Sequence, residues 1–146
     1  MRYTILFSII LFTFLSGCNK DKFKTIPDLK FSSVNTTELR TGQVLKFTLA
    51  FTDAEGDISD SVYVEKVVPD CPASSFAQWY PIPSFPTTNN QKGDIVVTFG
   101  YNADPYPSIS PQCNKTETAV FKFALRDKAK NISDTISSPP ITIIYQ

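Results

Sequence analysis

The sequence has 146 residues, and its 14 lysines and arginines balance its 14 aspartates and glutamates, so the formal net charge is zero. That balance gives no electrostatic reason to expect a nucleic-acid partner. The chain contains no histidine, which excludes Ser-His-Asp and Cys-His nucleophile systems, histidine-ligated zinc and imidazole proton shuttles. Composition still allows a mechanism that uses only carboxylates.

The first residues have the composition of a bacterial export signal. Arg2 precedes an apolar run from Ile5 to Leu15 that only Ser8 and Thr13 interrupt. A run of this length is too short to cross a bilayer core of about 30 Å, but it suits the apolar region of a signal peptide.

The apolar run ends in the tetrapeptide Leu-Ser-Gly-Cys at 15–18. It resembles the lipobox of bacterial lipoproteins, whose cysteine is diacylated on sulfur, becomes the first residue after cleavage by signal peptidase II and is then acylated on its amino group. The resemblance implies a signal peptide over 1–17 and lipidation of Cys18, with palmitate-type chains that hold the protein on a membrane. An ordinary secretory signal with a chance cysteine is the other interpretation. Asn19 stands where aspartate marks inner-membrane retention, which favours the outer membrane without indicating which of its faces.

A polar segment without periodicity follows, and we predict a flexible tether over 18–28 and a single domain over 29–146. In the domain, alternate residues are apolar, as in strands that bury one face. Clusters of Pro, Asn, Asp and Gly separate these segments, which predicts an all-β immunoglobulin-like sandwich of about seven strands. The expected strands cover 29–34, 44–52, 61–68, 94–101, 117–126 and 139–145, with a proline-rich edge strand near 79–86.

Two cysteines remain once Cys18 is assigned to lipid. An even pair in an exported chain predicts a disulfide between Cys71 and Cys113. The topology agrees, because these residues flank neighbouring strands of an immunoglobulin-like sheet at one end of the sandwich. The alternative is two free thiols, which an oxidising compartment disfavours.

Acidic residues gather in two loops that such a sandwich places at the same end. Four of them lie within 53–60, and Asp127 lies in the loop before the last strand. Hard oxygen ligands of this kind suit Ca²⁺, although the spacing is not that of an EF-hand. The candidate ligands are Asp53, Glu55, Asp57, Asp127 and Asn131. The simpler interpretation is that these residues cap and solvate their loops and pair with nearby basic residues.

The same two segments, FTDAEGDIS at 51–59 and LRDKAKNIS at 125–133, resemble paired motifs of small immunoglobulin-like outer-membrane lipoproteins of Gram-negative bacteria. That largely uncharacterised family implies a fold and an anchor rather than an activity. The chain departs from the pattern at Lys130, where the family has glycine. The departure puts a side chain into a tight turn and a cation near the expected site.

Aromatic residues in a proline-rich segment are a third candidate. Trp79 and Tyr80, with Tyr101 and Tyr106, could bind a sugar or a protein partner. The alternative is that they cover an edge of the sandwich.

These patterns together predict a lipid-anchored, non-catalytic binding or scaffolding module at the outer membrane, with a protein or glycan partner and a possible bound Ca²⁺. The alternative is a glycan-binding accessory lipoprotein of a polysaccharide-uptake system. An enzyme is the third possibility, but no catalytic residues are expected. The acids of 53–60 share one loop, whereas glycoside hydrolysis needs carboxyl groups on both sides of the scissile bond.

Overall fold

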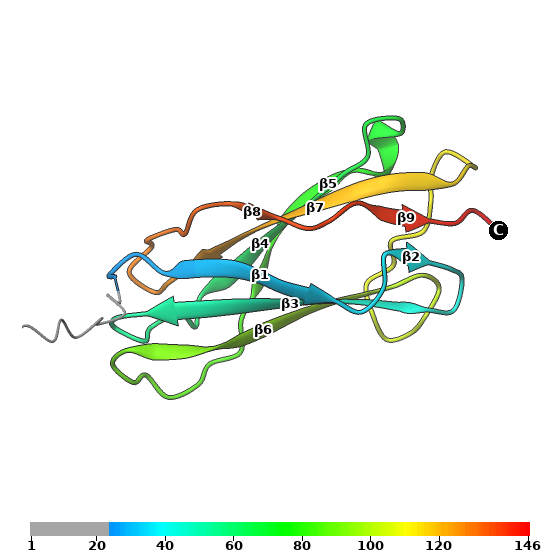
Figure 1. Ribbon diagram of the computed structural model, residues 1–146. Coiled ribbons are helices and arrows are strands. Elements are labelled where there is room, and N and C mark those ends of the chain that lie inside the picture. Colours follow the sequence, from blue (N-terminus) through cyan, green and yellow to red (C-terminus); the bar gives the residue numbers. More distant parts are fainter. Residues whose placement is uncertain (1–23) are drawn as a thin grey trace, which may run out of the picture.

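The computed structural model describes residues 24–146 (Figure 1). The expected signal peptide over 1–17, Cys18 and the first part of the expected tether lie outside these residues. Within them, no helix is long and apolar enough to cross a membrane. The strands are β1 (Asp28–Val34), β2 (Glu38–Leu39), β3 (Val44–Asp53), β4 (Ser61–Val67), β5 (Phe76–Pro81), β6 (Gln91–Gly100), β7 (Glu117–Arg126), β8 (Ile136–Ser137) and β9 (Ile141–Ile143), with one 3₁₀ turn, η1 (Pro72–Ser74).

The strands form two sheets that face each other as a sandwich (Figure 1). One sheet has the order β1-β3-β6, and the other has the order β2-β9-β7-β4-β5, with β8 also paired to β7. This division of the strands is that of an immunoglobulin-like sandwich, so the predicted fold class is confirmed. The proline-rich edge strand predicted near 79–86 is in part β5, which lies at an edge beside β4 but ends at Pro81, so residues 82–86 are not in a strand.

The strand boundaries differ from the predicted ones where local chemistry or pairing decides them. The last strand is only Ile141–Ile143 rather than 139–145, because prolines at 139 and 140 cannot donate to a ladder. The strand predicted from 94 begins at Gln91, since its pairing with β3 continues to Asp53. The two-residue strands β2 and β8 were not predicted, because two residues carry no alternation signal.

Aromatic rings from both sheets meet in the core. The ring of Phe47 on β3 lies 4.8 Å from that of Phe121 and 5.1 Å from that of Phe123, both on β7. All three side chains are fully buried. They belong to the alternating rows that the sequence indicated, which explains why the core could be predicted from the pattern.

Buried polar residues occupy inward-facing positions near the ends of three strands. The row of β3 ends in Asp53, and the row of β7 runs from Glu117 to Asp127 just beyond the strand. On β4 the row includes Lys66. These four side chains are buried, and they divide into two groups at opposite ends of the sandwich.

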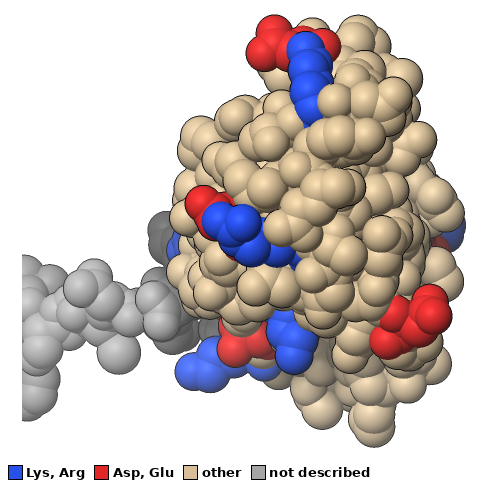
Figure 2. Space-filling view, turned by 90° about the vertical axis from the view of Figure 1, so that its right-hand side faces the viewer, with Lys and Arg blue, Asp and Glu red and all other residues tan. Residues whose placement is uncertain are grey.

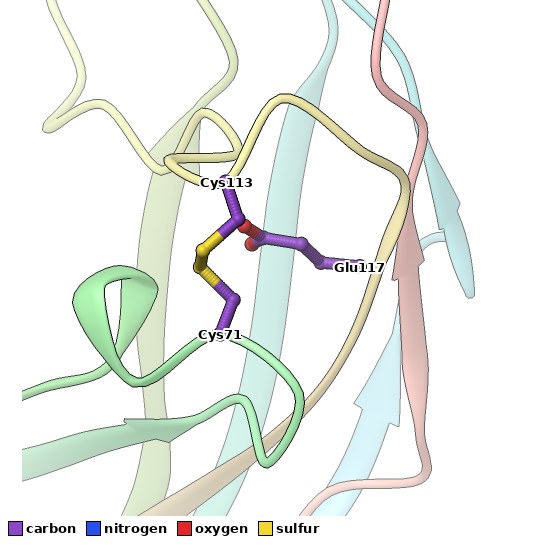
Figure 3. Close-up of side chains that lie close together, drawn as sticks. All are labelled: Cys71, Cys113 and Glu117. Atoms are coloured by element: carbon purple, nitrogen blue, oxygen red, sulfur yellow. A yellow bond between two sulfur atoms is a disulfide. The ribbon is translucent and has the colours of Figure 1, made fainter.

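A disulfide joins Cys71 to Cys113, as predicted, with their Cα atoms 6.0 Å apart (Figure 3). It links the segment after β4 to the long connection before β7. The bond therefore closes a loop of 42 residues at one end of the sandwich.

Candidate functional site

Three aspartates from two loops meet at the end of the sandwich away from the disulfide. Asp53, Asp57 and Asp127 each offer a carboxylate oxygen, and these oxygens lie within 4.8 Å of one another. The loops themselves are joined, because the backbone N–H of Lys128 donates to the carbonyl oxygen of Asp57 over 2.9 Å. The immunoglobulin-like connections thus bring the two acidic loops together as the topology requires.

Gly56 shapes the first loop around Asp53. The N–H groups of Gly56 and Asp57 both donate to Asp53 Oδ2, over 2.6 and 3.1 Å. Gly56 has φ +68°, and a Cβ atom there would lie 2.0 Å from the carbonyl oxygen of Thr88. Only glycine fits both the left-handed conformation and this close approach.

Asn131 and Lys130 shape the second loop around Asp127. The backbone N–H of Asn131 donates to Asp127 Oδ1 and its side-chain amide donates to Oδ2, each over 2.8 Å. Lys130 occupies the left-handed region with φ 72°, a backbone conformation that favours glycine.

The carboxylate of Asp53 is completely buried and only half satisfied. Its Oδ1 atom has no hydrogen-bond partner among residues 24–146. Burial raises the pKa of Asp53, the backbone bonds from Asp57 and Gly56 oppose this change, and the charges of Asp57 and Glu55 add to it. In the folded protein, an ionised Asp53 carboxylate without a counter-charge therefore costs free energy.

Gln91 supplies a second unsatisfied oxygen beside Asp53. It is the first residue of β6 and faces Asp53 directly in the β3–β6 ladder. Facing residues place their side chains on the same side of a sheet. Gln91 Oε1 is buried and, like Asp53 Oδ1, has no partner in the described part of the chain. No sequence pattern marks Gln91 as a ligand, and only its place in the ladder reveals it.

The other two expected ligands, Glu55 and Asn131, do not belong to the group of three aspartates. Glu55 is exposed and lies outside the group of three aspartates. Asn131 is half-buried and uses its amide nitrogen on Asp127. It therefore orients a neighbouring acid, whereas Glu55 points to solvent.

Lys130 does not neutralise the aspartate group, contrary to the concern that its cation would occupy the site. Its Nζ lies 2.5 Å from Asp60 Oδ1, and the Nε of Arg126 lies 2.6 Å from Asp60 Oδ2. Hydrogen bonds from Lys130, Ser61 and Arg126 hold the pKa of Asp60 well below its usual range. Both nearby cations are thus engaged by a fourth acid.

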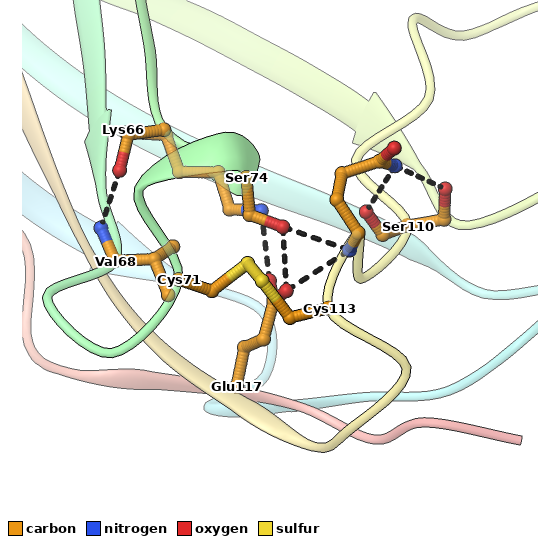
Figure 4. The surroundings of a disulfide bond; sticks show 9 residues. Lys66, Val68, Cys71, Ser74, Ser110, Cys113 and Glu117 are labelled. Carbon is orange, nitrogen blue, oxygen red and sulfur yellow. Dashed lines mark hydrogen bonds and ion pairs between the residues drawn. A yellow bond between two sulfur atoms is a disulfide. The ribbon is translucent and has the colours of Figure 1, made fainter.

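The opposite end of the core holds a buried ion pair that was not predicted from the sequence. Lys66 Nζ lies 3.4 Å from Glu117 Oε2, and both side chains are at most 1% exposed. Glu117 Oε1 also accepts bonds from the Ser74 hydroxyl over 2.5 Å and from the Gln112 N–H over 3.0 Å (Figure 4). The available signal was Lys66 itself, which occupies an inward position in the alternating row of β4.

The pKa values of both members of that pair are lowered, but for different reasons. For Glu117, burial alone would raise the pKa, but the bonds from Ser74, Gln112 and Lys66 together lower it. For Lys66, burial lowers the pKa and the attraction of Glu117 only partly opposes this change. Cys71 and Cys113 also lie beside Glu117 (Figure 3). Their sulfurs are bonded to each other, so they offer no thiolate to a metal.

The expected aromatic platform is not assembled. Trp79 and Tyr80 are consecutive residues of β5, and therefore face opposite sides of its sheet. The Trp79 ring packs against Tyr63, with centroids 5.3 Å apart, and the Arg126 guanidinium lies 4.4 Å from its centre. Tyr80 turns toward the core and Phe99, and burial raises its pKa.

The other two tyrosines of the expected platform do not join these residues on one surface. Tyr101 is buried, with 3% of its surface exposed, whereas Tyr106 is 38% exposed in the connection before β7. The structure thus favours packing roles for Trp79, Tyr80 and Tyr101.

A cavity of about 390 Å³ opens between β5 and β6. Its walls include Tyr80, Ile82 and Phe85 on one side and Val97 and Phe99 on the other. The cavity is mainly apolar and falls at the small end of the range for ligand pockets.

The fold and the site define the class as an immunoglobulin-like β-sandwich with an acidic cluster at one end and a disulfide at the other. No family model matches the sequence, and no curated protein matches it.

Similar solved structures include the sporulation control protein Spo0M from Bacillus subtilis, with a TM-score of 0.46 and 11% identity over 83% of this chain and 50% of that one. This chain therefore spans about half of that structure. A Niemann-Pick type C2 protein from the Japanese carpenter ant has a TM-score of 0.45 and 10% identity, covering 84% and 98% of the two chains. The CARDB domain of the PF1109 protein from Pyrococcus furiosus, in complex with di-metal ions, has a TM-score of 0.37 and 7% identity, covering 86% and 100%. These likenesses concern the arrangement of strands and do not extend to function.

Proposed function

We propose that the protein is a lipid-anchored, non-catalytic binding module of the bacterial outer membrane. The Leu-Ser-Gly-Cys tetrapeptide at 15–18 supports the anchor. One hydrogen bond supports a defined orientation: the N–H of Ala54 donates to the carbonyl oxygen of Lys24 over 3.1 Å. Lys24 begins the described chain, so the chain enters the sandwich at its acidic end.

The distance from anchor to domain is limited by the length of the intervening chain. Five residues lie between Cys18 and Lys24, so six steps of the chain connect them. An extended chain covers at most about 3.6 Å per step, or roughly 20 Å in all. The acidic end is therefore held near the lipid surface. Two apolar side chains at this end, Ile26 and Ile132, are exposed by 53% and 49%, and Lys24 and Lys128 are exposed beside them. These groups suit contact with lipid and its anionic headgroups.

The disulfide end then faces away from the membrane and is the surface we assign to a partner. It carries the connections over 35–43 and 101–116, at the right of Figure 1. Seen from that side, the surface is mostly uncharged, with a few small groups of acidic and basic side chains (Figure 2). A protein partner that is recognised through shape and polar contacts suits such a surface better than nucleic acid does. No observation favours the glycan-binding alternative, because Trp79 and Tyr80 do not share a face.

We expect the substitution Cys18→Ser to abolish labelling of the protein by radioactive palmitate. The variant should appear as a soluble protein or as an uncleaved precursor, since the acylated sulfur is gone. The matched control replaces both other cysteines, Cys71→Ala with Cys113→Ala, and should keep the label on Cys18. Equal palmitate incorporation by the wild type and the Cys18→Ser variant would refute the anchor.

We expect a photo-crosslinking residue to report different neighbours at the two ends of the sandwich. At Tyr106, which is exposed at the disulfide end, it should give a discrete protein adduct in intact membranes. At Ile132, exposed at the acidic end, it should give lipid adducts instead. The adducts are separated by electrophoresis and identified by mass spectrometry. Lipid adducts at Tyr106 would contradict the orientation, and no protein adduct there would contradict the partner surface.

A further inference from the structure

The buried carboxylates at the two ends of the core differ in whether a positive charge lies beside them. At the disulfide end, Glu117 has an ammonium group beside it and hydrogen bonds to both oxygens. At the other end, none of the residues 24–146 places a lysine or arginine nitrogen within 4.0 Å of Asp53, Asp57 or Asp127. A buried group of like charges without a counter-charge is costly.

We propose that Asp53, Asp57 and Asp127 bind one divalent cation of the Ca²⁺ class, with Gln91 as an additional oxygen ligand. This inference goes beyond the proposed function and is independent of the lipid anchor. The cation neutralises the three aspartates, as Lys66 neutralises Glu117 at the opposite end of the core. It joins the loop after β3 to the loop after β7.

The strongest support is the unpartnered oxygen of Asp53. The side chain is fully buried, one of its oxygens accepts two backbone N–H groups, and the other has no partner in the described chain. Buried polar atoms are nearly always satisfied, so an exception needs a physical explanation. The buried oxygen of Gln91, the residue that faces Asp53 across the ladder, is the same kind of exception. A single ion satisfies both.

The geometry fits the size of the ion. Ca²⁺ binds oxygens at about 2.3–2.6 Å, so two ligands of one ion lie at most about 5 Å apart. The carboxylate oxygens of the three aspartates already lie within 4.8 Å of one another. Three carboxylates and one amide oxygen leave positions for water in the six to eight that Ca²⁺ fills.

The loops are built to hold these ligands in place. Gly56 and the backbone of Asp57 fix one oxygen of Asp53, and Asn131 fixes the carboxylate of Asp127. Such outer contacts orient ligands and usually affect metal affinity strongly. Arg126 and Lys130 are held on Asp60 and leave the three acids free for an external cation.

We expect CaCl₂ to raise the melting temperature of the full-length chain purified in detergent, relative to the same protein in EDTA. At a hundredfold excess over the dissociation constant the rise should be roughly 10 °C. Titration calorimetry with CaCl₂ should give one site per chain. The variant Asp53→Asn keeps an acceptor for the loop N–H groups but loses the charge, so it should lose the temperature shift. Asp127→Asn should do the same.

The matched control is Glu55→Gln, which removes an exposed acid of the same loop and should keep the full shift. If Glu55→Gln loses as much of the shift as Asp53→Asn, the effect is general charge screening and the proposal fails. Equal melting temperatures in Ca²⁺ and EDTA, with no heat in the titration, also overturn it. Should Asp53→Asn not fold, Asp127→Asn and the wild-type titration still decide the question.

Discussion

Replacing Glu117 by glutamine is expected to lower the free energy of unfolding by about 3–5 kcal/mol. The reason is that Lys66, which is 1% exposed, would be left in the core without its counter-charge. The Ser74 hydroxyl and the Gln112 N–H would also lose their charged acceptor. Urea unfolding followed by fluorescence of the single tryptophan measures the change.

A surface ion pair in the same sheet is the control for this effect. Glu65 Oε2 on β4 lies 3.3 Å from Lys122 Nζ on β7. The two side chains are 32% and 40% exposed. Glu65→Gln should therefore cost less than about 1 kcal/mol. Equal effects of Glu65→Gln and Glu117→Gln would contradict the assignment of Glu117 as the buried partner.

The buried pair of Lys66 and Glu117 also predicts how the stability of the protein depends on acid. Because the pKa of Glu117 is lowered in the folded state, its stabilising contribution is present above its unfolded value of about 4.5. That contribution is lost as the pH falls through the lower folded value. Glu117→Gln should thus remove part of the acid sensitivity, which urea unfolding at a series of pH values detects.

Removing the Cys71–Cys113 disulfide is the second change with a large expected effect. The double variant Cys71→Ala and Cys113→Ala should lose about 2–5 kcal/mol of stability, and the chain-entropy model gives roughly 4 for a loop of this length. Reduction of the wild type should give a similar loss, as measured by urea unfolding with and without reductant.

Thiol chemistry checks the bond directly. In the folded, non-reduced protein an alkylating reagent should modify neither Cys71 nor Cys113, and intact-mass analysis should show both modified after reduction. Two thiols that react without reductant would contradict the bond. Unfolding curves that coincide with and without reductant would instead mean that the bond adds little to stability.

Alternation of apolar residues was sufficient to place the main strands and the core. Leu45, Phe47 and Leu49 are all fully buried on β3, where their spacing put them. The period of two is a property of the strand backbone and therefore appears in the sequence directly. The disulfide followed from the same topology, because neighbouring strands of known direction bring both cysteines to one end.

The aromatic platform was predicted without applying this alternation. Trp79 and Tyr80 looked like one surface because they are adjacent in sequence, yet adjacent strand residues face opposite ways. Tyr101 continues the inward row of β6 and is buried with it. Applying the period to these residues as well would have separated them.

The sequence by itself determined the fold class, the loops that carry the acids and the pairing of the cysteines, because these depend on periodicity and chain order. Only the tertiary structure decided which charges meet. Lys66 and Glu117 are 51 residues apart and meet because β4 pairs with β7, the strand that Glu117 begins. Lys130 turns to Asp60 rather than to Asp53, and Gln91 faces Asp53 because β6 pairs with β3. Contacts between distant residues depend on how the sheets pair and pack, and a single sequence carries no local signal of that arrangement.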